Sequence, residues 1–305
     1  MSAAVIGPSG ETISGYGDVE MYTYIRSAAK PFQLLSALQT GIHTEFGLSD
    51  KEIAVCCASH SGEEMHVEAV KSILDKTGLD SSLLGCGVHP PLGKEVRQRM
   101  NKEGSAPTVL HNNCSGKHSA MLAAAKIKGE PLDDYLNPAH PVQQRILEVI
   151  KKYSEEDEIR IGVDGCSAPV FYLTIEKMAL MYRKLAESEE GGLLNDIWKK
   201  MTSYPLMVAG TERFDALLMT SGKGNVLSKM GAEGVQCMAV KTPEGPIGLA
   251  LKVHDGSRRA VAPAVFHILD KVGVTPEGDF DNLRRPVLKN HVGTEVGWIE
   301  VSDDK

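Results

Sequence analysis

A serine, a lysine and a proline within six residues impose the strongest local constraint on this chain. In the segment Arg26-Ser27-Ala28-Ala29-Lys30-Pro31, the serine and the lysine are three positions apart, which places both side chains on one face of a helix. Proline is tolerated only in the first turn of a helix, so the sequence predicts a helix that begins near Ser27 and continues through residues 32–38. The Ser27 hydroxyl would then lie at a helix N-terminus, where backbone N–H groups favour negative charge.

This spacing is compatible with catalysis and with a purely structural role. A serine is a weak nucleophile near neutral pH, and a lysine whose pKa is lowered by burial or by a cationic neighbour can take its proton. The pattern S-x-x-K also occurs by chance in a chain of this length, as an N-cap serine followed by a solvated lysine. The segment alone leaves both interpretations open.

The composition favours small-molecule chemistry over nucleic-acid or membrane binding. The 305 residues include 42% hydrophobic and 24% charged residues, and the formal net charge is −7. Clustered lysine and arginine, which nucleic acids and anionic membranes require, are not expected on such a surface. The sequence has no basic leader followed by an apolar run and no apolar stretch long enough to span a bilayer, so we expect a cytoplasmic protein.

Hydrophobic periodicity predicts strands near both chain ends and helices between them. Pro243-Glu244-Gly245 predicts a hairpin turn between two of the strands. The pattern indicates one domain over residues 1–305, with the sheet built from both ends and a helical lobe at roughly 60–220. The predicted strands are 5–14 (with a turn), 19–25, 53–58, 226–229, 235–241 and 247–253, and the further predicted helices are 63–78, 116–128, 141–153, 174–187, 205–220 and 262–272, followed by a polar tail.

Two cysteine-containing segments carry the densest functional groups. The segment 111–118, HNNCSGKH, places Cys114 and Lys117 three residues apart at a predicted helix start, which favours a thiolate that acts as a nucleophile or a metal ligand. The segment 162–169, GVDGCSAP, offers an acid and the thiol of Cys166. If the two thiols meet, zinc is the natural ligand. The alternative is that the asparagines cap a helix and the cysteines, which lack C-x-x-C spacing, are inert.

A lysine near the end of the chain lies on a predicted strand just before a glycine turn. Lys229 is followed by Met230 and Gly231, and glycine allows a substrate to approach the strand closely. Together with S-x-x-K, this arrangement is similar to the lysine-x-glycine strand of penicillin-binding and β-lactamase-like enzymes. The alternative is an ordinary turn lysine.

Five motifs in order resemble the L-asparaginase II family, the zinc-binding asparaginases with a penicillin-binding/glutaminase-like fold. The resemblance implies an α+β fold of the β-lactamase/penicillin-binding/glutaminase-like type, in which helices cover an antiparallel sheet. Family members have an additional strand before residues 3–5, so we expect an altered sheet edge or dimer contact here. The motifs are RSAAKP at 26–31, CASHSGE at 57–63, NNCSGKH at 112–118, GVDGC at 162–166 and SKMGAEG at 228–234.

The resemblance also implies two serine–lysine pairs that face one pocket. Ser27 would be the nucleophile with Lys30 as its base, while Ser59 and Lys229 would relay protons or polarise the amide. A Zn²⁺ cofactor would be held by three side chains with a position left for water. The implied metal ligands are Cys114, Lys117 and Cys166, and the implied substrate-binding or supporting residues are Arg26, His60, Asn113 and Asp164.

The expected reaction is hydrolysis of L-asparagine to L-aspartate and ammonia through an acyl-enzyme ester, in a homodimer. Glutamine is expected to be a weak substrate at most. The alternatives are another amidase, glutaminase or peptidase of the same fold, a catalytically degenerate zinc-binding module, and a cysteine hydrolase that uses Cys114.

Overall fold

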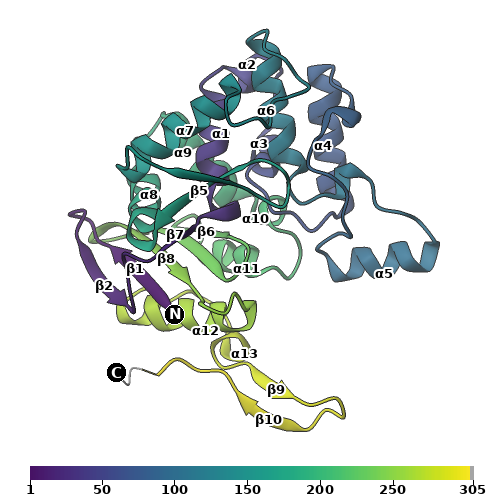
Figure 1. The fold of residues 1–305 in the computed structure, drawn as a ribbon. Coiled ribbons are helices and arrows are strands. Elements are labelled where there is room, and N and C mark those ends of the chain that lie inside the picture. The colour runs from purple at the N-terminus through teal and green to yellow at the C-terminus, as the bar shows by residue number, and fades with distance from the viewer. Residues whose placement is uncertain (303–305) are drawn as a thin grey trace.

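A five-stranded antiparallel sheet joins the two ends of the chain in this computed structural model, which describes residues 1–302. The strand order is β2-β1-β8-β7-β6 (Figure 1). The buried strand β1 (Ser2–Ile6) pairs with β2 (Thr12–Tyr16) on one side and with β8 (Gly245–Lys252) on the other. The order continues through β7 (Val235–Thr242) to β6 (Val226–Met230), which forms the far edge.

Helices cover both faces of this sheet and bury different residues of the same strands. Helix α8 (Ile175–Glu187) packs on one face, and α12 (Val261–Lys271) lies on the other (Figure 1). Because side chains alternate along a strand, Val226 packs with the α12 cluster while Leu227 packs with the helical lobe. Lys229 shares the parity of Leu227 and therefore projects toward the helical lobe. The expected α+β class, an antiparallel sheet covered by helices, is confirmed.

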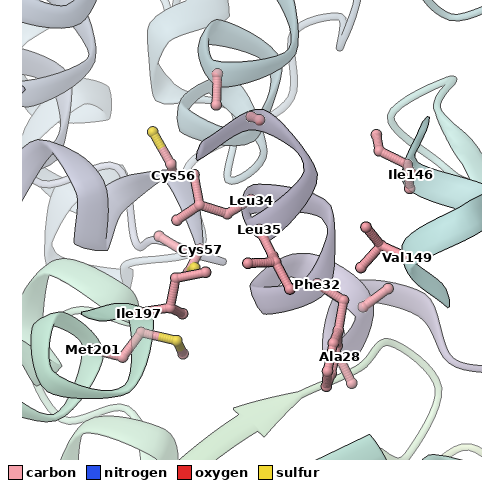
Figure 2. Packing of buried hydrophobic residues seen from close by; sticks show 14 of the residues in the cluster. Ala28, Phe32, Leu34, Leu35, Cys56, Cys57, Ile146, Val149, Ile197 and Met201 are labelled. Atoms are coloured by element: carbon pink, nitrogen blue, oxygen red, sulfur yellow. The ribbon is translucent and has the colours of Figure 1, made fainter. Parts of the chain in front are cut away.

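The helical lobe packs around α1 (Lys30–Leu38), all of whose residues are buried. Figure 2 shows Phe32, Leu34 and Leu35 of this helix among apolar side chains of the surrounding helices. The other helices of the lobe are α2 (Ile42–Glu45), α3 (Asp50–Cys56), α4 (Glu64–Thr77), α5 (Lys94–Glu103), α6 (Ser115–Ile127), α7 (Pro141–Ser154), α9 (Leu193–Ser203), α10 (Pro205–Val208) and α11 (Phe214–Ser221).

Two smaller sheets complete the described part of the chain. The strand β5 (Pro169–Thr174) lies between β3 (Tyr22–Tyr24) and β4 (Arg160–Val163). It therefore connects the segment before Ser27 with the segment that leads to Cys166. Beyond α12, the chain forms α13 (Asp281–Arg284) and a hairpin of β9 (Val287–Lys289) and β10 (Glu295–Trp298) (Figure 1).

Three predicted elements differ from the structure for identifiable reasons. The strand predicted at 53–58 is wrong, because residues 50–56 form α3, which begins with a capping box between Ser49 and Glu52. A short, fully apolar run has the same pattern in a buried helix as in a buried strand. The single helix predicted at 205–220 is two helices, α10 and α11, and the chain between them passes through Gly210 with φ +117°. The polar tail contains the β9–β10 hairpin.

No helix within residues 1–302 combines the length and the apolar character needed to cross a bilayer.

Gly248 fixes how closely α8 approaches the sheet. A Cβ at this position would lie 2.0 Å from the carbonyl oxygen of Ala179 and 2.2 Å from the nitrogen of Arg183, both backbone atoms of α8. We expect Gly248→Ala to lower the free energy of unfolding by about 3 kcal/mol, because the helix must move to admit the methyl group. Urea denaturation checks this. Gly165→Ala, where a Cβ meets open space, is the control and should change stability little; equal effects in both variants would contradict this packing.

Candidate functional site

The hydroxyl of Ser59 lies between two buried lysines. Its Oγ accepts hydrogen bonds from Nζ of Lys30 at 3.1 Å and from Nζ of Lys229 at 2.8 Å. All three side chains have at most 1% of their surface exposed. Ser59 follows α3, and its backbone N–H donates to Val208, so the loop is fixed from two sides. The arrangement can move a proton between a hydroxyl and an amine without contact with bulk water.

Lys30 is held by backbone carbonyls as well as by the serine. Its Nζ donates to the carbonyl oxygens of Ala58 and of Asn113, the latter at 3.1 Å. The ammonium group therefore has three acceptors from two separate segments of the chain. These bonds tie the start of α1 to the loops that precede α4 and α6.

The pairing predicted between Ser27 and Lys30 is not the one found. Lys30 extends to Ser59, and within residues 1–302 the Ser27 hydroxyl makes no hydrogen bond. The local reason is a change of helix type: residues 26–29 form a 3₁₀ turn that begins at Arg26 with φ +54°, and the α-helix starts only at Lys30. Ser27 is half-buried and lies on that turn.

Burial lowers the pKa of Lys229 to about 7. The positive charges of Lys30 and Arg213 lower it further, and the carboxylate of Asp215 acts in the opposite direction. Besides Ser59, the amine donates to the carbonyl oxygen of Met230 at 3.1 Å. Near neutral pH a substantial fraction of Lys229 is therefore an uncharged amine that can accept a proton.

Asp215 supports this lysine from the opposite face of β6, a role that the sequence did not reveal. One carboxylate oxygen accepts from the Ser228 hydroxyl at 2.7 Å and from the Gln236 amide at 2.7 Å, and the other accepts from the backbone N–H of Met230 at 2.9 Å. The two residues that flank Lys229 are thus fixed by one buried carboxylate. The only signal in the sequence is an acidic residue at the start of an apolar helical segment.

His60 links the loop that carries Ser59 to the start of α6. The backbone N–H of Gly62 donates to Nδ1 of His60, and Nε2 lies 2.9 Å from the Ser115 hydroxyl. Burial places the pKa of His60 well below its usual value, so the ring is neutral and Nε2 carries the hydrogen. His60 therefore donates to Ser115 and acts as a support for the loop.

Arg26 connects three of the predicted segments. Its guanidinium binds Asp164, with Nη2 2.7 Å from Oδ1, and Glu233, with Nη1 3.0 Å from Oε2. These contacts tie the Ser27 turn to the Cys166 loop and to the turn after β6. Asn113 contributes its carbonyl to Lys30, and its side-chain oxygen lies 3.0 Å from Nε2 of His89.

The two predicted thiols meet beside Lys117. Nζ of Lys117 donates to Sγ of Cys166 at 3.1 Å, and all three side chains are buried. The pKa of Cys166 is far below its usual value, first because the Cys114 thiol donates a hydrogen bond to it and then because of Lys117. Burial would lower the pKa of Lys117, but Cys166 and Cys114 raise it. A thiolate thus lies next to a second thiol and the charged ammonium group of Lys117.

This donor set suits zinc only if the amine of Lys117 takes part. Within the described range 1–302, no group of three His, Cys, Asp or Glu side chains is placed to hold a metal ion. Two sulfur atoms and one nitrogen are chemically suitable ligands, and the buried ring of His118 lies beside Cys166 and helps to lower the pKa of its thiol. The cluster therefore has the donor chemistry that fits a bound metal.

The low pKa of Lys229 predicts a measurable stability cost. The unfolded lysine titrates near 10.4, so between pH 7 and about 10 the unfolded state binds more protons and stability rises with pH. Below pH 7 the cost is complete, at about 4–5 kcal/mol. Lys229→Met removes this cost but also loses the two hydrogen bonds of the amine. We therefore expect the variant to be about 2 kcal/mol more stable than the parent at pH 6, with a smaller gain at pH 9.

Urea denaturation at the two pH values checks this difference. Lys102→Met, which removes an exposed lysine of α5, should show no such pH-dependent gain. A Lys229→Met variant that is less stable than the parent at pH 6 would show that the amine is not held in a destabilised charged form.

One of the comparisons with known proteins identifies a family. The family model of L-asparaginase II matches residues 1–301. No curated protein sequence matches this chain. Among solved structures, the chain is similar to a beta-lactamase from Mycobacterium bovis, with 12% sequence identity, a TM-score of 0.49, and coverage of 90% of this chain and 95% of that chain.

Two structures of the protein Mglu, one of them in the presence of 4.3 M NaCl, are each 13% identical with TM-scores of 0.40. These matches cover 95% of this chain, and 66% and 71% of the Mglu chains. No activity follows for this chain from identities this low. The match over nearly its whole length does establish the family: this chain belongs to the L-asparaginase II family.

Proposed function

We propose that this protein hydrolyses the side-chain amide of L-asparagine to L-aspartate and ammonia through a serine ester. Membership of the L-asparaginase II family supports an amidohydrolase. The observation that carries the proposal is the buried contact of Ser59 with two lysines, one of which has a pKa of about 7. Such a group can accept a proton from a hydroxyl and return it to a leaving amine at neutral pH.

The two serines differ in exposure, which suggests a different catalytic role for each. Ser27 is half-buried and its hydroxyl is free of hydrogen bonds within residues 1–302, so it can meet a substrate. Ser59 is 1% exposed and held between Lys30 and Lys229, which suits proton transfer better than attack. We assign Ser27 as the nucleophile and Ser59 as the hydroxyl that passes its proton toward Lys229.

The proposed reaction has two steps, formation of the serine ester and its hydrolysis. Oγ of Ser27 bonds to the amide carbon, its proton moves to the lysine–serine cluster, and the C–N bond breaks as the nitrogen takes that proton and leaves as ammonia. Water next attacks the ester carbon and loses a proton to the same cluster; the C–O bond then breaks as Oγ of Ser27 takes that proton, which releases aspartate and restores Ser27.

We propose Zn²⁺ as the cofactor, held by Cys114, Lys117 and Cys166. The thiolate of Cys166 and its contact with Lys117 support this assignment. Lys117 would bind as the neutral amine, which a neighbouring dication favours. When bound, zinc would act as a Lewis acid near the site and would join the start of α6 to the loop after β4. Arg26 and Asp164 orient that loop relative to Ser27.

Release of ammonia from asparagine tests the reaction. We expect turnover of asparagine, much slower turnover of glutamine, and a loss of about 10³-fold or more in kcat for Ser27→Ala and for Ser59→Ala. Ser61→Ala alters the same loop but contacts neither lysine, because its hydroxyl donates to Ala209, and it should retain most of the activity. Mass spectrometry of the quenched enzyme should find the aspartyl ester on Ser27. Full activity in both serine variants, or no ammonia from asparagine, would refute the proposal.

Metal content tests the cofactor separately. We expect about one zinc ion per chain by elemental analysis, and loss of that zinc in Cys114→Ala and Cys166→Ala. Cys237→Ala is the matched control, because this buried thiol lies on β7 outside the cluster and should leave the zinc content unchanged. Equal zinc contents in all three variants would place the metal elsewhere.

A further inference from the structure

A cavity of about 300 Å³ lies beneath the sheet edge, on the face of β6 opposite Lys229. Its walls come from the start of α11, the start of α12, and the segment around α13, β9 and the end of β10. Figure 1 shows α13 and the β9–β10 hairpin next to α12, away from the helical lobe. Neither Ser59 nor Lys229 lines this cavity, so it is separate from the site described above.

Three arginines line the cavity without a carboxylate partner. Arg213 enters from the residue before α11, and Arg258 and Arg259 enter from the turn before α12. Within residues 1–302, none of the three takes part in an ion pair, whereas other arginines at this end of the molecule do, such as Arg284 with Asp270. Three guanidinium groups therefore gather around one cavity, and none of them forms an ion pair with a carboxylate of the described residues.

Arg213 is the least satisfied of the three. It is half-buried, and the only hydrogen bond of its side chain in the described residues goes from Nη2 to Sδ of Met230, a weak acceptor, at 2.9 Å. Burial lowers the pKa of Arg213 and the charge of Arg258 lowers it further, while the carboxylates of Asp215 and Glu63 act in the opposite direction. A guanidinium in this position is stabilised when an anion binds to it.

Asp215 follows Arg213 by two residues and lines the same cavity, but its carboxylate oxygens are hydrogen-bonded to other groups. Its two oxygens already accept hydrogen bonds from Ser228, Gln236 and the backbone of Met230. These bonds hold the carboxylate against the strand. The cavity thus has a net excess of positive charge at its arginine side.

The remaining wall is mainly apolar, with Phe214, Leu288 and Ile299 among its side chains. A volume of about 300 Å³ is at the lower end of the range for small-molecule sites. We propose that this cavity binds a small organic carboxylate, whose charged group meets Arg213 and Arg258 and whose aliphatic part lies against the apolar wall. This site goes beyond the proposed amide hydrolysis and does not depend on it.

Isothermal titration calorimetry of the full chain with hexanoate tests the proposal. We expect saturable binding of one hexanoate per chain. Hexylamine, which has the same chain length and the opposite charge, should not bind, and sulfate, which lacks an aliphatic part, should bind more weakly. Arg213→Gln and Arg258→Gln should each weaken hexanoate binding about tenfold or more, because each removes a charged hydrogen-bond donor.

Arg99→Gln, which removes an exposed arginine from α5, is the matched control and should bind hexanoate like the parent. Arg258 is exposed, so its variant should fold even if Arg213→Gln does not, and circular dichroism verifies this. The proposal is overturned if hexanoate shows no saturable binding, if hexylamine binds equally well, or if folded Arg258→Gln keeps the parent's affinity. Because the readout is binding, the result is independent of whether the protein releases ammonia from asparagine.

Discussion

The burial of two lysine amines against one serine hydroxyl is the constraint on which the rest of this structure depends. Within residues 1–302, neither Lys30 nor Lys229 forms an ion pair, so their charges are balanced by backbone carbonyls and by the more distant Asp215. Removing such groups from water is costly, and the cost is met by the extensive apolar core around α1 (Figure 2). Proteins commonly accept such a cost where a group must titrate for function.

The fold brings the required segments together because the sheet joins both chain ends and α1 runs through the helical lobe. Lys229 reaches the lobe from β6, an edge strand of the sheet, while Ser59 reaches the same point from the loop after α3. Arg26 then joins the Ser27 turn to the Cys166 loop through Asp164. Ser59 with its two lysines and the thiol cluster are therefore held in one framework, and a displacement of α1 would disturb both.

The sequence pointed to residues that the structure brings together, but it did not predict all of their contacts. The lysines at 30 and 229 and the thiols at 114 and 166 are conspicuous in the sequence, and they do converge. The partner of Lys30 could not be predicted, because a long side chain at the junction of a 3₁₀ turn and an α-helix can reach acceptors on distant segments. The strand expected at 53–58 fails for the opposite reason: a fully buried helix shows no alternation of polar and apolar residues. Asp215 has no local signature, since its function arises from contacts across β6 and β7.

The most direct test of this account is the pKa of the Lys229 amine, measured by ¹⁵N nuclear magnetic resonance of lysine-labelled protein, with Lys229→Met to assign the signal. We predict that this amine titrates near pH 7, several units below the pKa that the same lysine has in the unfolded chain. A Lys229 signal that remains that of a charged ammonium up to pH 10 would contradict the central claim.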